Sequence, residues 1–168
     1  MKRTILALIA VNSAMAPCVA LASDRSDIIA VVQAYNTAGN KGDRSGYASY
    51  CTSDAVVVDH VPPYLFQGPA ACADEYDAVV AWCAQNKIGT EFVQKLLDPV
   101  FIEVQKDVAY AVFPVKVWGK QNGRKQIETL YLTTVLRRQA HNWRIANLVY
   151  SSLGWRPVVG RDEQLRRR

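Results

Sequence analysis

The residue pattern of this chain changes part-way along, from helical spacing to strand-like runs, and this change most limits its possible folds. Apolar residues recur at helical spacing over residues 28–38 and 72–83. After Thr90, four segments rich in valine, isoleucine, leucine and aromatic residues follow one another, separated by short polar turns. The turn at Asn122-Gly123 is a strong hairpin signal, because this pair suits antiparallel strands. The order predicts an α+β domain with helices packed on one face of an antiparallel meander.

The expected elements can be placed along the chain from these patterns. We predict three N-terminal helices, which cover residues 28–39, residues 43–51 and a segment that begins at Gly68-Pro69. A strand at residues 54–60 precedes the third helix, and long strands follow at 92–105, 108–119, 125–138 and 143–152. A curved antiparallel sheet that is half-covered by helices encloses a cone-shaped cavity.

The first 22 residues have the pattern of a secretory signal peptide. Two basic residues precede an apolar stretch that is too short to span a bilayer, and Ala20-Leu21-Ala22 offers small residues for cleavage before Ser23. A lipoprotein interpretation through Cys18 is weaker, because Pro17 stands where a small residue is expected. No later segment has the length and apolarity of a membrane span. We therefore expect a periplasmic or secreted protein, with its domain at 23–152 and a basic irregular tail at 153–168.

The charge distribution argues against nucleic-acid binding. The formal charge of +5 includes the two basic residues of the signal peptide, and the tail from Arg156 onward carries five arginines against two acidic residues. The body of the domain is therefore close to neutral and shows no basic face. The two histidines, His60 and His141, lack the spacing of metal ligands, and no nucleotide or flavin motif is present. We predict neither a metal nor a cofactor.

Three cysteines remain after the predicted cleavage. Cys72 and Cys83 lie on one predicted helix, about 16 Å apart at the helical rise per residue. This separation far exceeds the reach of a disulfide. Any internal disulfide must therefore include Cys51, and three buried thiols are the alternative.

Asp59 is the strongest candidate for a catalytic residue. Along the predicted strand 54–60 it shares one face with Ala55 and Val57, while His60 points to the opposite face. A carboxylate on an apolar face must be hydrogen-bonded, solvated or held protonated, which makes Asp59 a candidate general base. The alternative is that Asp59 only accepts hydrogen bonds from the turn that follows, with His60 at the surface or at a dimer contact.

Four segments carry a resemblance to a known family: AYNTAGNKGD, CTSDAVVVDH, FQGPAACADEY and TTVLRRQAHNWRI. Together they resemble the nuclear transport factor 2-like superfamily, and within it the SnoaL-like and ketosteroid isomerase-like branch, over residues 24–152. The resemblance implies an α+β cone of the cystatin-like kind, with a curved antiparallel sheet and three N-terminal helices on one face. It also implies a homodimer formed through the sheet.

The resemblance also implies roles for individual residues. Ketosteroid isomerases place a base aspartate at the end of the first strand and a tyrosine on the first helix, which Asp59 and Tyr35 match. Asp59 would take a proton from carbon next to a carbonyl, and Tyr35 would stabilise the enolate oxygen. The second oxyanion donor of those enzymes is a protonated aspartate, where this chain has Thr133, and Tyr131 or Thr133 would donate that bond instead. A core role for Tyr35 is the alternative.

An apolar pocket is expected to hold the ligand. We predict that its walls are formed by seven aromatic residues, namely Tyr64, Phe66, Tyr76, Phe92, Tyr110, Phe113 and Trp118. Such a lining suits a small hydrophobic ligand such as a polyketide, steroid or terpenoid. The sequence thus favours a cofactor-free isomerase, cyclase or dehydratase, and the alternative is a non-catalytic module for hydrophobic-ligand binding or dimerisation.

Overall fold

The computed structural model describes residues 16–89 and 92–167 of the chain. Its helices are α1 (Ala16–Lys41), α2 (Arg44–Ser49), α3 (Ala71–Gln85) and α4 (Gly160–Arg167). Its strands are β1 (Cys51–Val58), β2 (Leu65–Gln67), β3 (Val93–Leu96), β4 (Phe101–Gln105), β5 (Val108–Gln121), β6 (Arg124–Gln139) and β7 (Asn142–Pro157). The predicted α+β class, with three helices before the long strands, is confirmed.

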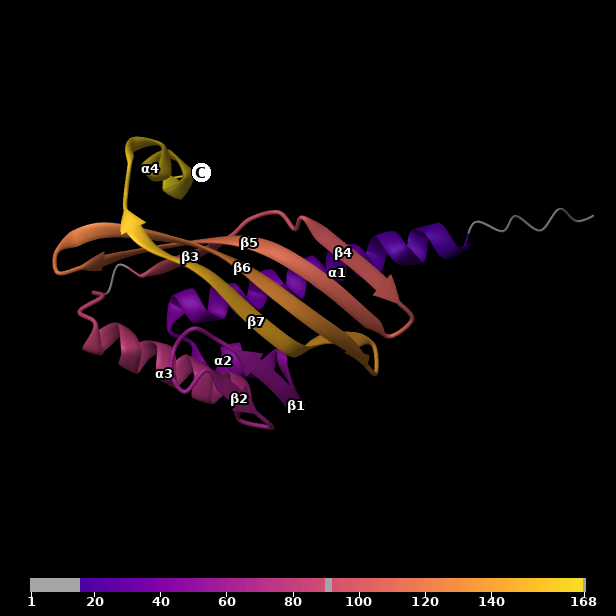
Figure 1. Cartoon of the computed structure of the whole chain (residues 1–168). Coiled ribbons are helices and arrows are strands. Elements are labelled where there is room, and N and C mark those ends of the chain that lie inside the picture. The colour runs from indigo at the N-terminus through magenta and orange to yellow at the C-terminus, as the bar shows by residue number, and fades with distance from the viewer. Residues whose placement is uncertain (1–15, 90–91, 168) are drawn as a thin grey trace, which may run out of the picture.

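The strands form one curved sheet, in which β5, β6 and β7 are the long central strands (Figure 1). The strand order is β2-β1-β7-β6-β5-β3, and β4 pairs with a different stretch of β5 from the one that β3 pairs with. The sheet is mixed rather than wholly antiparallel, because β1 pairs in parallel with β7. This pairing joins segments that lie about ninety positions apart, so no local turn signal announces it.

The helices α1, α2 and α3 supply apolar residues to a core against the inner face of the sheet. Ile28, Val32 and Tyr35 of α1 are fully buried and belong to the same cluster as Phe113 and Leu132 of the sheet. Residues on the long strands alternate between buried and exposed positions, as expected for a sheet with one covered face. In Figure 1, α2 and α3 lie on one side of the sheet, and α4 lies at the far end of β7.

The strand predicted at 92–105 is two strands in the structure. β3 ends at Leu96 and β4 begins at Phe101, and Pro99 lies in the gap. Proline has no N–H to donate to a neighbouring strand, so it interrupts the ladder with β5. The backbone N–H groups of Leu97 and Val100 still donate to β5, which keeps both strands on the same partner.

The C-terminal segment is ordered, so the prediction of an irregular tail from 153 onward is wrong. β7 continues to Pro157, and α4 follows it. Arg156 donates hydrogen bonds to Asp162 at 2.7 and 3.0 Å, and Asp162 accepts a further bond from the Val159 N–H at 3.0 Å. These bonds hold the start of α4 against the end of β7.

Most of the predicted signal peptide, residues 1–15, lies outside the described residues. α1 begins at Ala16, so the last residues before the predicted cleavage point are helical. Within the described part of the chain, no helix has the length and apolarity needed to cross a membrane. Cleavage before Ser23 stays a prediction.

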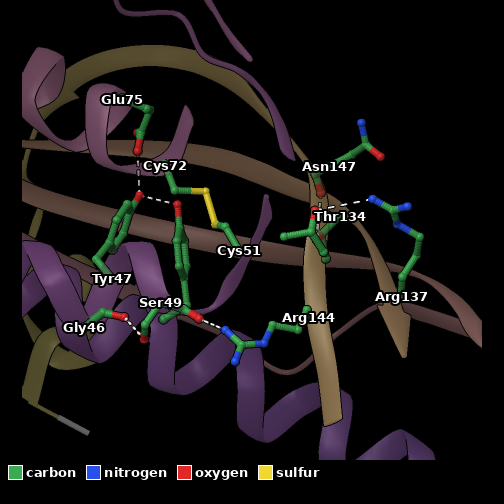
Figure 2. Close-up of a disulfide and its surroundings, with 12 residues drawn as sticks. Gly46, Tyr47, Ser49, Cys51, Cys72, Glu75, Thr134, Arg137, Arg144 and Asn147 are labelled. Carbon is green, nitrogen blue, oxygen red and sulfur yellow. Dashed lines mark hydrogen bonds between the residues drawn. A yellow bond between two sulfur atoms is a disulfide. The ribbon is translucent and has the colours of Figure 1, made fainter. Parts of the chain in front are cut away.

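A disulfide joins Cys51 at the start of β1 to Cys72 in the first turn of α3 (Figure 2). Its presence confirms that Cys51 is the necessary partner, and Cys83 is the free thiol. The crosslink fixes the beginning of α3 against β1. Glu75, one turn further along α3, is thereby held beside Tyr47 of α2 (Figure 2).

Candidate functional site

A cavity of about 480 Å³ lies between α3, the end of β1 and the inner face of the sheet. Most of its lining is apolar or aromatic, and it includes Tyr76, Trp82, Phe92, Leu130 and Trp155. The ionisable groups in this lining are Asp59, His60, Glu75, Glu128, two tyrosines besides Tyr76, and Cys83. No lysine or arginine of the described residues lines it. The cavity is therefore a mostly apolar chamber with an acidic group of side chains on its wall.

Asp59 and His60 occupy the point where the chain leaves β1. β1 ends at Val58, and the Asp59 side chain turns back to accept the Val61 N–H at 2.9 Å. This local bond is the turn interaction that the sequence allowed for Asp59. Because the chain is no longer a strand at this point, His60 does not follow the alternation, and its side chain lines the cavity. The prediction that His60 faces away is wrong for this reason.

The imidazole of His60 lies between two carboxyl groups. Its Nδ1 is 3.0 Å from Asp59 Oδ1, although the ring N–H is not aligned for a full hydrogen bond. Its Nε2 is 3.6 Å from Glu128 Oε1. The edge of the ring contacts Trp82, with the centroids 6.1 Å apart, which helps to fix its orientation. The contact with Asp59 raises the pKa of His60 above 6.5, because a nearby carboxylate stabilises the imidazolium.

Glu128 reaches the cavity from β6, where its register partners are Val117 and Trp155. Only 2% of the residue is exposed. The Ser152 hydroxyl on β7 donates a hydrogen bond to Glu128 Oε1. Burial raises the pKa of the Glu128 carboxyl above its ordinary value, because desolvation disfavours the carboxylate.

A second buried carboxyl, Glu75, is held by a cluster of tyrosines. The Tyr47 hydroxyl donates to Glu75 Oε2 at 2.8 Å, and Tyr35 donates to the Tyr47 hydroxyl. The Tyr150 hydroxyl lies 3.1 Å from that of Tyr35 and 3.4 Å from that of Tyr47. Burial and the nearby Asp59 carboxylate raise the pKa of Glu75 well above its ordinary value. Burial also raises the pKa of Tyr35 and Tyr47, so their hydroxyls stay protonated and donate.

The other polar features of the wall have simpler chemistry. Burial raises the pKa of the Cys83 thiol to about 11, so this free cysteine is protonated near neutral pH and is a weak nucleophile. Among residues 16–89 and 92–167, no set of histidine, cysteine and acidic side chains is arranged to hold a metal ion. The chemistry of the wall therefore depends on the positions of His60 and the three carboxyl groups.

The model of the SnoaL-like domain matches residues 28–154, about three quarters of the chain. This chain belongs to the SnoaL-like domain family. No curated protein matches it in sequence. The match confirms the resemblance of the four sequence segments to this family.

Solved structures show the same fold at low identity. Hexachlorocyclohexane dehydrochlorinase LinA type 3 from Novosphingobium barchaimii is 17% identical, with a TM-score of 0.71 over 84% of this chain and 94% of that one. A ketosteroid isomerase-like protein from Erwinia carotovora atroseptica is 20% identical, with a TM-score of 0.61 over 77% and 95%. A nuclear transport factor 2-like protein of unknown function from Pseudomonas putida is 18% identical, with a TM-score of 0.62 over 77% and 87%. At these identities the likeness establishes the fold alone.

The structure brings only part of the predicted site of this SnoaL-like protein to the cavity. Asp59, Tyr76 and Phe92 line it. Tyr35 is fully buried behind Tyr47 and Tyr150, and its hydroxyl bonds those tyrosines. Tyr35 is not among the lining residues.

The remaining predicted wall and donor residues lie elsewhere. Phe66, Phe113 and Trp118 are buried but do not border the cavity. Tyr64, Tyr110 and Tyr131 are each more than 40% exposed. Tyr131 and Thr133 point to the opposite face of β6 from the buried Leu130 and Leu132, which removes them as oxyanion donors in the cavity.

The histidine of the wall and two of its three carboxyl groups were not predicted as site residues: His60, Glu75 and Glu128. Glu128 stands two residues before Leu130 on the inward face of β6, so it is an acidic residue in an apolar alternation. That signal is the same one that marks Asp59 on β1, and it could have identified Glu128. Glu75 follows Cys72 by three positions on one face of α3, which is a comparable signal for a helix.

Proposed function

We propose that this protein is an enzyme that moves a proton on a small, neutral and largely apolar compound, as isomerases, cyclases and dehydratases do. The observation that carries the proposal is the position of His60 in the cavity wall, between Asp59 and Glu128. A histidine flanked by carboxyl groups in a mostly apolar cavity is well suited to general acid–base chemistry.

In this proposal His60 is the base and Asp59 is its positioning residue. The neutral imidazole accepts a proton from a carbon next to a carbonyl, and the resulting imidazolium is stabilised by the Asp59 carboxylate 3.0 Å from Nδ1. The Val61 N–H holds the Asp59 carboxylate in place. Asp59 is thus moved from the role of base to a supporting role, because its oxygen is already engaged by its own turn.

The charge of the cavity supports a neutral substrate. Three carboxyl groups and no lysine or arginine of the described residues line it. A phosphate or carboxylate group would lose its hydration there without a lysine or an arginine to pair with. The apolar remainder of the wall favours a hydrophobic body on the ligand, which agrees with the predicted small hydrophobic carbonyl compound.

Two structural neighbours have names that refer to reactions of this class. One structural neighbour is a dehydrochlorinase and another is a ketosteroid isomerase-like protein. The loss of hydrogen chloride and the shift of a double bond both require that a proton leaves carbon. The inference to this chain rests on the shared fold together with its own His60.

We also propose export and self-association, as the sequence predicts. The disulfide between Cys51 and Cys72 supports an oxidising compartment such as the periplasm. On the outer face of the sheet, the exposed rings of Phe101 and Tyr110 contact each other with centroids 5.9 Å apart, and Tyr131 is exposed on the same face. An apolar patch of this kind supports a dimer formed through the sheet.

Deuterium exchange into a simple ketone tests the role of His60. In heavy water the wild-type protein is expected to catalyse exchange of the protons next to the carbonyl of benzylacetone, followed by NMR. His60→Gln should lower that rate by about 10²–10⁴-fold, because it removes the base. His141→Gln, which changes the other histidine at an exposed turn, is the matched control and should leave the rate unchanged. No exchange by the wild type contradicts the proposed function and favours a binding module. Exchange that survives in His60→Gln contradicts the role of His60 as the base.

A further inference from the structure

Removal of a proton from carbon by His60 and Asp59 leaves Glu128 without a role, although Glu128 also lies beside His60. It approaches His60 from the side opposite Asp59, with its Oε1 3.6 Å from His60 Nε2. Nε2 is also the nitrogen that faces away from Asp59, and it is therefore the atom that would take the substrate proton. A substrate whose C–H group contacts Nε2 would therefore place a neighbouring functional group close to the Glu128 carboxyl.

The surroundings of Glu128 favour its acid form. The residue is almost fully buried, and burial raises the pKa of its carboxyl. The groups that face it are His60, the Ser152 hydroxyl, the Cys83 thiol and, further away, Asp59. Burial has the largest effect on the pKa of Glu128 and raises it, while the Ser152 hydrogen bond and the charge of His60 lower it, and none of the facing groups is a lysine or an arginine. A carboxyl in this setting can carry a proton and deliver it to a ligand atom.

We infer that Glu128 is a second catalytic residue, the general acid that protonates a leaving hydroxyl, and that the substrate class is a neutral β-hydroxy carbonyl compound. This inference rests on the proposed role of His60 as the base. His60 Nε2 takes the proton next to the carbonyl, and the electron pair of that C–H bond forms the new double bond. The C–O bond at the β carbon breaks, and its oxygen takes the Glu128 proton and leaves as water.

The same geometry returns both groups to their starting states. After the reaction His60 carries a proton and Glu128 is a carboxylate, and they face each other across 3.6 Å. Transfer of that proton from His60 to Glu128 restores the neutral base and the neutral acid. The overall change is substrate to unsaturated carbonyl compound plus water, which needs no oxidant, reductant or further reactant.

Glu75 does not fit this role as well. Its Oε2 accepts the Tyr47 hydroxyl at 2.8 Å, and it lies beside Asp59 rather than beside the free nitrogen of His60. Its carboxyl is thus engaged by a neighbouring protein group. Glu128 accepts one bond from Ser152 and has His60 as its ionic neighbour, so it is the carboxyl placed to serve a ligand.

A pair of substrates that differ only in the leaving group tests Glu128 directly. The probes are the aldol adduct of benzaldehyde and acetone, a β-hydroxy ketone, and its acetate ester, whose leaving acetate needs no proton. Elimination from either gives the same conjugated ketone, which is followed by its absorbance. Glu128→Gln should lower the rate for the hydroxy ketone by about 100-fold or more, and that for the ester by less than tenfold.

The controls separate this inference from the proposed function. Glu103→Gln, which changes an exposed carboxylate on β4, should leave both rates unchanged. His60→Gln should abolish both reactions, since both need the base. Equal loss on the two probes in Glu128→Gln overturns the role of Glu128 as an acid but leaves His60 as the base. Failure of the wild type to eliminate from either probe overturns the inference, while the exchange of benzylacetone protons decides the proposed function separately. Elimination that persists in His60→Gln overturns the proposed role of His60 as the base and, with it, the inference.

Discussion

Glu75 and Glu128 are two buried carboxyl groups on the wall of one cavity, yet their surroundings differ. Each is only 2% exposed, and burial raises the pKa of both. Glu75 lies in a closed network in which Tyr47 donates to it and Tyr35 and Tyr150 complete the cluster. Glu128 lies beside His60, whose side chain is 31% exposed. Both carboxyl groups are therefore buried on the cavity wall, and they differ in their partners: tyrosines at Glu75 and the His60 imidazole at Glu128.

This difference shows how one cavity separates a structural carboxyl from a chemical one. In the Glu75 cluster Tyr35 donates to Tyr47, Tyr47 donates to Glu75, and the Tyr150 hydroxyl lies beside both tyrosines, so the network links α1, α2, α3 and β7. The crosslink from Cys51 to Cys72 strengthens the same corner by fixing the start of α3. At Glu128 the neighbour is the His60 imidazole, whose pKa is raised by Asp59, and both residues line the cavity. A raised pKa alone does not distinguish these cases, but the neighbouring groups do.

Glu75→Gln should change stability more than chemistry. A carboxyl whose pKa is raised by folding adds stability at low pH, and this stability is lost as the pH rises through the folded-state value. The amide of the variant does not titrate, so its free energy of unfolding relative to wild type should increase as the pH rises above the unfolded-state pKa of about 4.3, by about 1.4 kcal/mol per pH unit at most. Denaturant titrations at several pH values measure it, with Glu103→Gln as the exposed control. A relative free energy that stays flat with pH would show that Glu75 is not desolvated.

Tyr35→Phe should have the smaller effect. It removes a hydroxyl that bonds Tyr47 and Tyr150, so a loss of about 1 kcal/mol in the free energy of unfolding is expected. The exchange rate with benzylacetone should change by less than tenfold, because Tyr35 does not line the cavity. A rate loss of about 100-fold with little change in stability would instead restore Tyr35 as the oxyanion donor that the family resemblance implies.

Local patterns were sufficient to predict most of the fold. The change from helical to strand spacing placed α1, α3 and the long strands, and the Asn122-Gly123 turn joins β5 to β6 as expected. The parallel pairing of β1 with β7 was not predicted, and neither was the regular structure of the C-terminal segment, where β7 continues to Pro157 and α4 follows. Both depend on contacts between distant segments or on a single ion pair, Arg156 with Asp162, which a local pattern does not specify.

The site could be predicted only where a regular element continued. Alternation along β1 correctly gave Ala55, Val57 and Asp59 a common buried face. The same rule failed one residue later, because the strand ends at Val58 and His60 takes its direction from a turn. On β6 the alternation marks Glu128 as an inward acidic residue, but the family resemblance implied Thr133 as the donor instead. Which groups meet in the cavity depends on how α3, β1 and β6 come together.

The ionisation of His60 tests the account most directly, because it requires no knowledge of the substrate. Nitrogen NMR of the imidazole ring across pH gives its pKa, with His60→Gln used to assign the signal. We predict a value above 6.5 in the wild type that falls in Asp59→Asn and does not change in Asp98→Asn, an exposed acid outside the cavity. A value at or below 6.5 that is unaffected by Asp59→Asn would contradict the pairing of His60 with Asp59, and with it the assignment of His60 as the supported base.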